Sequence, residues 1–109
     1  MQANKAINIG RNVIIHKNVK IGRNSLIGDN VILGINEKEL RIGENCIIRS
    51  GTIIYGNVTI GNNLKTGHNA MIRENTTIGD NVMIGTNVVI DGNCKIGNNV
   101  SIQTGAYIT

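Results

Sequence analysis

The segment LKTGHNAMIREN, residues 64–75, carries side chains that could do chemistry in an otherwise repetitive chain. It contains His68, one of 2 histidines in the protein, and an imidazole takes up and releases a proton near neutral pH. Thr66 stands just before it, where neighbouring segments have Ile or Leu, and Arg73 and Glu74 follow. Acid–base catalysis is the chemistry that a histidine in such a setting suits. Whether these residues form a site depends on the elements that hold them.

Those elements follow from a six-residue repeat that extends over residues 7–109. Its main position is aliphatic in every hexad except at Thr66, and its spacing is broken once, after Leu33. The series is Ile9, Ile15, Ile21, Ile27, Leu33, Ile42, Ile48, Ile54, Ile60, Thr66, Ile72, Ile78, Ile84, Ile90, Ile96, Ile102 and Ile108. A second, mostly smaller residue lies two positions earlier, so both side chains point to the same side of a short strand.

Each hexad also has a residue suited to a sharp corner. Three positions after the main residue the chain almost always has Asn, with Gly51 and Gly105 as substitutes. Asn and Gly tolerate the left-handed αL conformation, so a strand of a few residues followed by a forced corner is predicted for each hexad. The chain has no Pro, which agrees with parallel strands that need nearly every backbone N–H. We therefore predict an all-β fold.

The [Ile/Leu]-Gly-x-Asn-[Val/small]-x hexads resemble those of the hexapeptide-repeat acyltransferases, whose fold is a left-handed parallel β-helix. The resemblance covers residues 7–109 and implies three hexads in each triangular coil. Seventeen hexads then make five to six coils in a single domain, residues 1–109. Leu33 and Ile42 are nine residues apart instead of six, which predicts a short insertion around residues 35–39 that bulges at a corner. We interpret it as a solvated loop.

The residue before each main position points outward, and every third hexad shares a face of the prism. The polar face has Lys20, Arg41, Thr59, Thr77 and Lys95. The mixed face has Asn8, Leu26, Ile47, Lys65, Met83 and Ser101. The apolar face has Ile14, Ile32, Ile53, Met71, Val89 and Tyr107. A continuous outward apolar stripe indicates an interaction surface, and the resemblance implies a homotrimer through this face with active sites in the clefts between subunits.

The resemblance also implies a reaction. Hexapeptide acyltransferases commonly use a corner histidine as the general base, so His68 is the candidate, with its other ring nitrogen held by a carbonyl or carboxylate. The run around the Thr-Gly-His-Asn corner is similar to the branch that acetylates amino groups of nucleotide-linked sugars. This implies transfer from acetyl-CoA to an amino or hydroxyl group of a sugar, a small-molecule acceptor. Asn69, Arg73, Glu74 and Tyr55 are the candidate substrate-binding residues.

Each of these residues also has a purely structural interpretation. Thr66 has nearly the shape of Val, so it is a tolerated core residue if its hydroxyl finds a backbone acceptor. Asn69 fills a corner that Asn fills in nearly every hexad, and Arg73, Glu74 and Tyr55 could form a salt bridge or pack at an interface. Members of that branch usually continue into further coils, so the resemblance implies that the usual C-terminal part is missing here. The alternative is therefore a structural or assembly solenoid without catalysis, or an inactive fragment of such an enzyme.

Composition restricts the partners. The net charge of +4 and pI near 9.4 permit an anionic ligand such as coenzyme A, but 2 tyrosines and no Lys/Arg run argue against nucleic acid. Cys46 and Cys94 fall at small inward positions of different faces, which predicts buried thiols with no disulfide or metal role. Zinc needs three ligands at one place, whereas His16 and His68 fall at different corners. With no apolar run for a signal or membrane segment, a cytoplasmic protein is predicted.

Overall fold

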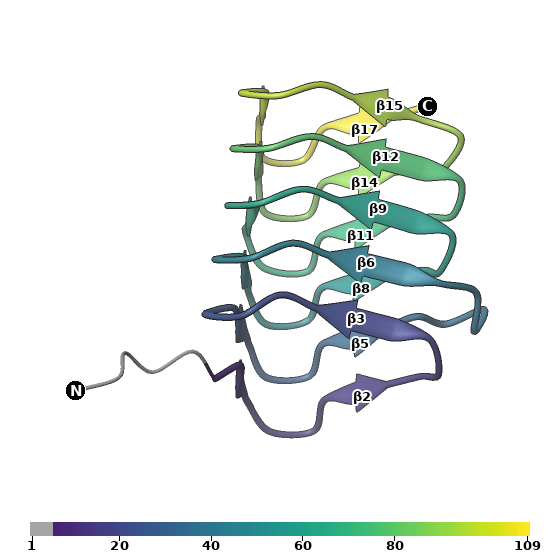
Figure 1. Cartoon of the computed structure of the whole chain (residues 1–109). Helices are drawn as coiled ribbons and strands as arrows, with labels where there is room; N and C mark the ends of the chain where they lie inside the picture. Colours follow the sequence, from purple (N-terminus) through teal and green to yellow (C-terminus); the bar gives the residue numbers. More distant parts are fainter. Residues whose placement is uncertain (1–5) are drawn as a thin grey trace.

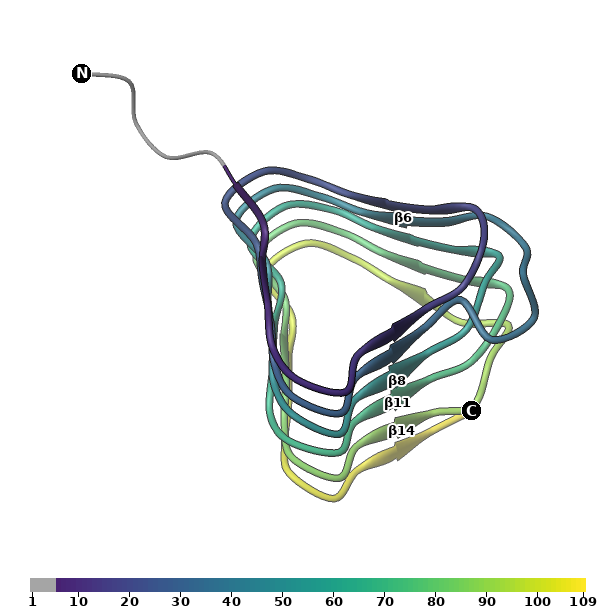
Figure 2. The ribbon, with the colours of Figure 1, turned by 90° about the horizontal axis from the view of Figure 1, so that it is seen from below.

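The computed structural model describes residues 6–109, which form a left-handed parallel β-helix without an α-helix in that range. The coils stack along one axis, each strand above its equivalent in the coil before it (Figure 1). Viewed from the N-terminal end, the cross-section is triangular, and the chain winds anticlockwise as it recedes (Figure 2). This is the left-handed sense, so the predicted fold class is confirmed.

The strands form three parallel sheets, of six, six and five strands, one for each face of the prism. The mixed face contains β1 (Asn8–Ile9), β4 (Leu26–Ile27), β7 (Ile47–Ile48), β10 (Lys65–Thr66), β13 (Met83–Ile84) and β16 (Ser101–Ile102). The apolar face contains β2 (Ile14–Ile15), β5 (Ile32–Leu33), β8 (Ile53–Ile54), β11 (Met71–Ile72), β14 (Val89–Ile90) and β17 (Tyr107–Ile108). The polar face contains β3 (Val19–Ile21), β6 (Leu40–Ile42), β9 (Val58–Ile60), β12 (Thr76–Ile78) and β15 (Lys95–Ile96). The predicted sorting of hexads into faces is confirmed.

The corners have the backbone conformation that the sequence predicts. The corner asparagines have φ between 52° and 64°, and Gly51 and Gly105 have φ of 76° and 78°. Glu37, in the insertion, has φ of 60° and is the one residue in the described part of the chain, other than Asn and Gly, with a positive φ. Asn tolerates this region because its short polar side chain can hydrogen-bond to the nearby backbone, whereas the longer Glu side chain does so less readily. Glu37 is therefore a point of backbone strain.

The core is a ladder of aliphatic side chains inside the triangle. Leu33, Ile48, Ile54, Ile72 and Ile84 are each 0% exposed, and the exposed fraction rises only in the outermost coils. Stacking a coil on each side removes these side chains from water, which is how a solenoid without large aromatic residues builds a core. The described residues include no helix long and apolar enough to cross a membrane.

The two thiols differ in burial. Cys46 is buried and Cys94 is half-buried, and both are free. The prediction of a buried core thiol is therefore confirmed for Cys46. For Cys94 it is wrong, because Cys94 precedes β15, the edge strand of its sheet, and is covered on one side only in part. Burial is the main reason why the pKa of the Cys46 thiol is raised, since a thiolate would lose its hydration there.

The insertion leaves the prism at the corner that joins the apolar face to the polar face (Figure 2). Its anchor is Asn36, whose Oδ1 accepts a hydrogen bond from the Gly56 N–H at 2.9 Å while its Nδ2 donates to the Gly56 carbonyl at 3.4 Å. The Asn57 N–H donates to the Glu39 carbonyl at 2.7 Å. The loop is thus tied to the coil above it by its backbone and by one amide side chain.

Candidate functional site

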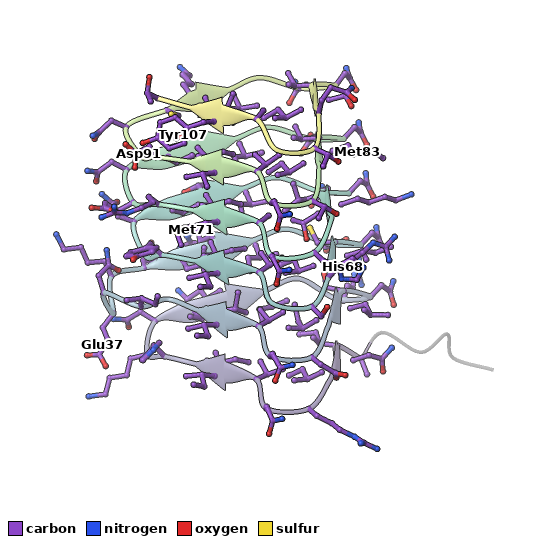
Figure 3. The ribbon with its side chains drawn as sticks, turned by 180° about the vertical axis from the view of Figure 1, so that it is seen from behind. Glu37, His68, Met71, Met83, Asp91 and Tyr107 are labelled. Carbon is purple, nitrogen blue, oxygen red and sulfur yellow. The ribbon has the colours of Figure 1, made fainter. Side chains whose placement is uncertain are left out.

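His68 lies at the corner between β10 and β11, where the mixed face meets the apolar face. Figure 3 looks onto the apolar face and places His68 at its right-hand edge, away from Met71 in the middle of the sheet. The side chain is exposed. Gly67 precedes it because a Cβ there would lie only 2.4 Å from the Thr86 backbone nitrogen, so no larger residue fits so close to the next coil.

The imidazole of His68 is hydrogen-bonded to the preceding coil, and its backbone is hydrogen-bonded to the following coil. Its Nδ1 lies 2.8 Å from the hydroxyl oxygen of Ser50, one coil earlier. Its backbone N–H donates to Thr86 Oγ1 at 3.2 Å, and its carbonyl accepts the Asn87 N–H at 2.9 Å. The ring therefore has a fixed partner, but that partner is a hydroxyl and not the carbonyl or carboxylate expected from the sequence. A serine occupies this corner position, and nothing in the repeat marks it as a partner of His68.

Thr66 occupies the core directly before this corner and is 2% exposed. Its hydroxyl oxygen accepts the Arg49 N–H at 3.0 Å and lies 3.3 Å from Thr52 Oγ1. Thr52 Oγ1 donates in turn to the Gly67 carbonyl at 3.3 Å. The condition set for Thr66 as a tolerated core residue, a backbone acceptor for its hydroxyl, is met only indirectly: its backbone partner is a donor, and it reaches a carbonyl through the buried hydroxyl of Thr52.

The Thr66 hydroxyl also changes the ladder between β7 and β10. In the coil below, the Gly28 N–H donates to the Ile48 carbonyl at 2.7 Å, and in the coil above, the Gly67 N–H donates to the Ile84 carbonyl at 2.7 Å. At the equivalent place the Arg49 N–H is directed to a side-chain oxygen instead. The register of these two strands contains only the pair Lys65 and Ile47. Thr66 is therefore a local departure from the regular ladder.

Tyr55, Arg73 and Glu74 lie together at the corner where the apolar face meets the polar face. The Arg73 guanidinium lies 5.0 Å from the centre of the Tyr55 ring, and its Nε lies 3.2 Å from Glu74 Oε1. Arg73 is also 3.9 Å from Asp91 in the next coil. The pKa of Glu74 is lowered, first by its own backbone N–H and then by Arg73, and the hydrogen bond that Arg73 donates to Glu74 raises the pKa of Arg73. This cluster is half-exposed and internally paired.

The predicted site residues thus divide into two groups. His68 and the corner residue Asn69, with φ of 59°, lie before β11, whereas Arg73 and Glu74 lie after it. The second corner is at the left-hand edge in Figure 3, on the side of Asp91 and Glu37. The candidate residues therefore lie at the two edges of the apolar face, and one chain does not bring the two groups together.

Two grooves lie along β10 and β13 on the mixed face, and sequence reasoning did not assign their residues to a site. The smaller groove lies beside the His68 corner, whereas the larger lies toward the opposite corner, where Asn45, Asn63 and Asn81 line it. The smaller has a volume of about 200 Å³ and the larger about 400 Å³, and both are lined by Lys65 and Met83. The smaller groove is further lined by Arg49, Thr66, Gly67, Ile84, Gly85, Thr86 and Thr104. Two signals were present: Lys65 is the one charged outward residue of the mixed face, and Arg49 replaces the Gly found at Gly28 and Gly67.

The second histidine is separate from this site. His16 follows β2 at the corner between the apolar and polar faces, where its Nδ1 lies 3.9 Å from Glu37 Oε2. Within residues 6–109, no group of three or more His, Cys, Asp or Glu side chains is arranged to hold a metal ion.

Comparison with known families agrees with the fold. The family model described as bacterial transferase hexapeptide (six repeats) matches residues 40–74 and 75–109, and the model described as hexapeptide repeat of succinyl-transferase matches residues 18–55. The chain belongs to the bacterial hexapeptide transferase family. Repeats of this kind are typical of acyltransferases, which generally use acyl-CoA donors. No individual curated protein matches the sequence.

Proposed function

We propose that the protein is an acyl-CoA-dependent acyltransferase that moves an acetyl group to an amino or hydroxyl group of a sugar or nucleotide-linked sugar. The observation that carries this proposal is the exposed imidazole of His68, held through Nδ1 at 2.8 Å from Ser50 Oγ beside a groove with Arg49 and Lys65. With Nδ1 occupied, Nε2 is the nitrogen available to a substrate. No hydrogen bond to Nε2 is present among residues 6–109.

In the proposed reaction, His68 Nε2 takes the proton from the acceptor amine or hydroxyl as that atom attacks the thioester carbonyl. The acceptor N–H or O–H bond breaks, and a bond forms between the acceptor atom and the acyl carbon. The C–S bond of the thioester breaks, and the sulfur leaves with the electron pair. The imidazolium then returns the proton, by way of solvent, to the thiolate of coenzyme A.

The proposed donor is acetyl-CoA, whose phosphates need positive charge nearby. Arg49 and Lys65 both line the smaller groove. Neither is in an ion pair with another residue in the described range, whereas Arg23, Arg41 and Arg73 are paired with Glu44, Glu39 and Glu74. Cations without an internal partner are the ones available to an anionic ligand.

The proposed assembly is a homotrimer through the apolar face. Ile14 and Tyr107 are 51% and 61% exposed, and the side chains between them form a continuous apolar stripe of half-buried residues: Ile32, Ile53, Met71 and Val89. Packing this face against neighbours would remove the stripe from water. It would also let the corner with Tyr55, Arg73 and Glu74 of one subunit approach the corner with His68 and Asn69 of the next.

The test is transfer of the acetyl group. The protein is incubated with acetyl-CoA and a panel of amino sugars and nucleotide-linked amino sugars, and products are measured by mass spectrometry. His68→Asn should lower turnover by about 10²–10⁴-fold, the usual contribution of a general base, whereas His16→Asn should leave it unchanged. Turnover of His68→Asn within about threefold of the wild type would contradict the proposed role of His68.

A structural or assembly solenoid is the second candidate function. The observation that favours it is the separation of the predicted site residues between two corners, with Arg73 and Glu74 already satisfied by each other at 3.2 Å. The two candidates differ in one measurement. Binding of acetyl-CoA by isothermal titration calorimetry is expected for the acyltransferase, with weaker binding by Lys65→Ala, and no binding is expected for the solenoid.

A further inference from the structure

Ser50 and His68 are joined across two successive coils. The two residues are 18 positions apart, which is one full coil, so the parallel register places the Ser50 corner directly below the His68 corner. The contact between Ser50 Oγ and His68 Nδ1, at 2.8 Å, is within the normal range for a hydrogen bond. It is the single hydrogen bond of the His68 ring among residues 6–109. The orientation of the ring therefore depends on Ser50.

The place of Ser50 is in turn set by buried groups. Its neighbour Arg49 donates its backbone N–H to Thr66 Oγ1 at 3.0 Å, and the Ser50 carbonyl accepts the Asn69 N–H at 2.9 Å. Gly51, with φ of 76°, then turns the chain. Thr66 is 2% exposed and Thr52 0%, so the hydroxyl pair that supports this corner is shielded from water. The exceptional core residue Thr66 and the exceptional corner residue His68 thus belong to one hydrogen-bonded arrangement.

We propose that Ser50 is the positioning residue of His68 and that Thr66, through Arg49, holds Ser50 in place for this role. The inference rests on the proposed function and names the residues that prepare its general base. A ring with Nδ1–H donating to Ser50 presents the Nε2 lone pair to the acceptor. When Nε2 takes the proton, both ring nitrogens are donors, and the Ser50 oxygen continues to accept from Nδ1 without rearrangement.

A hydroxyl partner has a different consequence from a carboxylate partner. A carboxylate only accepts, so it selects one tautomer and also stabilises the charged imidazolium. A hydroxyl can rotate and can donate or accept, so it orients the ring and is compatible with either tautomer; in the proposed arrangement its oxygen accepts the Nδ1–H and adds little charge stabilisation. Loss of the hydroxyl should therefore lower turnover through a misplaced base while the substrate still binds.

The decisive measurement is the tautomer of His68 in the whole protein, read from the ring ¹⁵N shifts by NMR at a pH of about 9, where an ordinary imidazole is neutral. We expect the Nδ1–H form in the wild type and in Ser50→Thr, and a changed population in Ser50→Ala. Thr fits this corner because Thr86 and Thr104 hold the equivalent place in the two coils after that of His68. His16 gives an internal reference, and Ser101→Ala, an exposed residue on the mixed face, is the matched control.

Turnover gives the second readout. Ser50→Ala should lower kcat about 10- to 100-fold, by analogy with loss of the hydrogen-bond partner of a metal-bound histidine, with KM unchanged and with recovery in Ser50→Thr. Unaltered tautomer and kcat in Ser50→Ala, with turnover lost in His68→Asn, would overturn the role of Ser50 and leave the proposed function intact. Full turnover in His68→Asn would remove the proposed function, while the NMR result would still decide whether Ser50 orients the ring.

Discussion

The hydroxyl oxygen of Thr66 accepts the backbone N–H of Arg49 at 3.0 Å, at a place where the coils above and below use a main-chain carbonyl. In Thr66→Val we expect the Arg49 N–H to return to the main-chain carbonyl, as in those coils. The free energy of unfolding should then fall by only about 1 kcal/mol, because the Arg49 N–H keeps a partner and Thr52, which loses its contact with Thr66, still donates to the Gly67 carbonyl.

Thr66→Val should still change the positions of Ser50 and His68 at the adjacent corner. Amide and ring NMR signals of Ser50 and His68 should shift in Thr66→Val, while those of the polar face should not. Chemical denaturation followed by circular dichroism gives the stability. A loss of several kcal/mol would mean that the hydroxyl pair stabilises the fold, and that its effect on the corner is secondary.

Substitution of Glu37 by Asn should stabilise the protein. Glu37 has φ of 60°, and every other non-glycine residue with a positive φ among residues 6–109 is an Asn. Glu37→Asn should therefore stabilise the protein by about 0.5–1 kcal/mol, since Asn accepts the αL region more readily. The contact with His16 that it loses is long, at 3.9 Å, and exposed, so its contribution is small. The measurement is the denaturation midpoint.

Glu37→Gln is the matched control for that change. It removes the charge but keeps a long side chain in the αL region, so its stability should stay near that of the wild type. Equal stabilisation by Gln and Asn would assign the effect to the charge of Glu37 and not to the strain of its backbone.

The proposed trimer predicts that Met71→Glu dissociates the protein. The substitution places a carboxylate in the middle of the apolar stripe, where an unpaired buried charge costs several kcal/mol. Thr77→Glu, at the exposed outward position of the next strand on the polar face, should leave assembly unchanged. Sedimentation equilibrium measures both. A monomeric wild type would remove the trimer, and a trimeric Met71→Glu would show that a different face is used.

Cys46 should be slow to react. Burial raises the pKa of its thiol, so the thiolate that attacks alkylating reagents is scarce at pH 8, and the sulfur is also shielded. Alkylation by iodoacetamide should be at least about tenfold slower in the folded protein than in guanidinium chloride, and slower than at the half-buried Cys94. Peptide mapping by mass spectrometry gives both rates.

The raised pKa of Cys46 also predicts how the free energy of unfolding changes with pH. A thiol whose pKa is raised in the folded state contributes its full stability below the ordinary value of about 8.5, and this contribution is lost as the pH rises above it. Cys46→Ala should accordingly lose less stability than the wild type between about pH 8 and pH 10. An identical loss in both proteins would contradict the raised pKa.

The sequence determined the fold because each hexad contains its own strand-forming and corner-forming residues. The inward aliphatic residues specify the strands, and Asn or Gly at the αL position specifies each corner, so that all three faces could be assigned residue by residue. Stacking needs only neighbouring coils, and therefore few long-range choices were left open. The left-handed sense came from resemblance, since the period alone does not determine the hand of the coil.

The site was decided by tertiary structure. The sequence marked Thr66 and His68 as exceptions, but it could not show that Ser50 and Arg49, one coil earlier, are their partners, because hydrogen bonds between coils depend on side-chain direction and distance. It also could not show that Arg73 and His68, at the two ends of one short strand, lie at different corners of the triangle with separate sets of partners. Periodicity identifies the coil and the face of a residue, and only the folded coils determine which side chains meet at a corner.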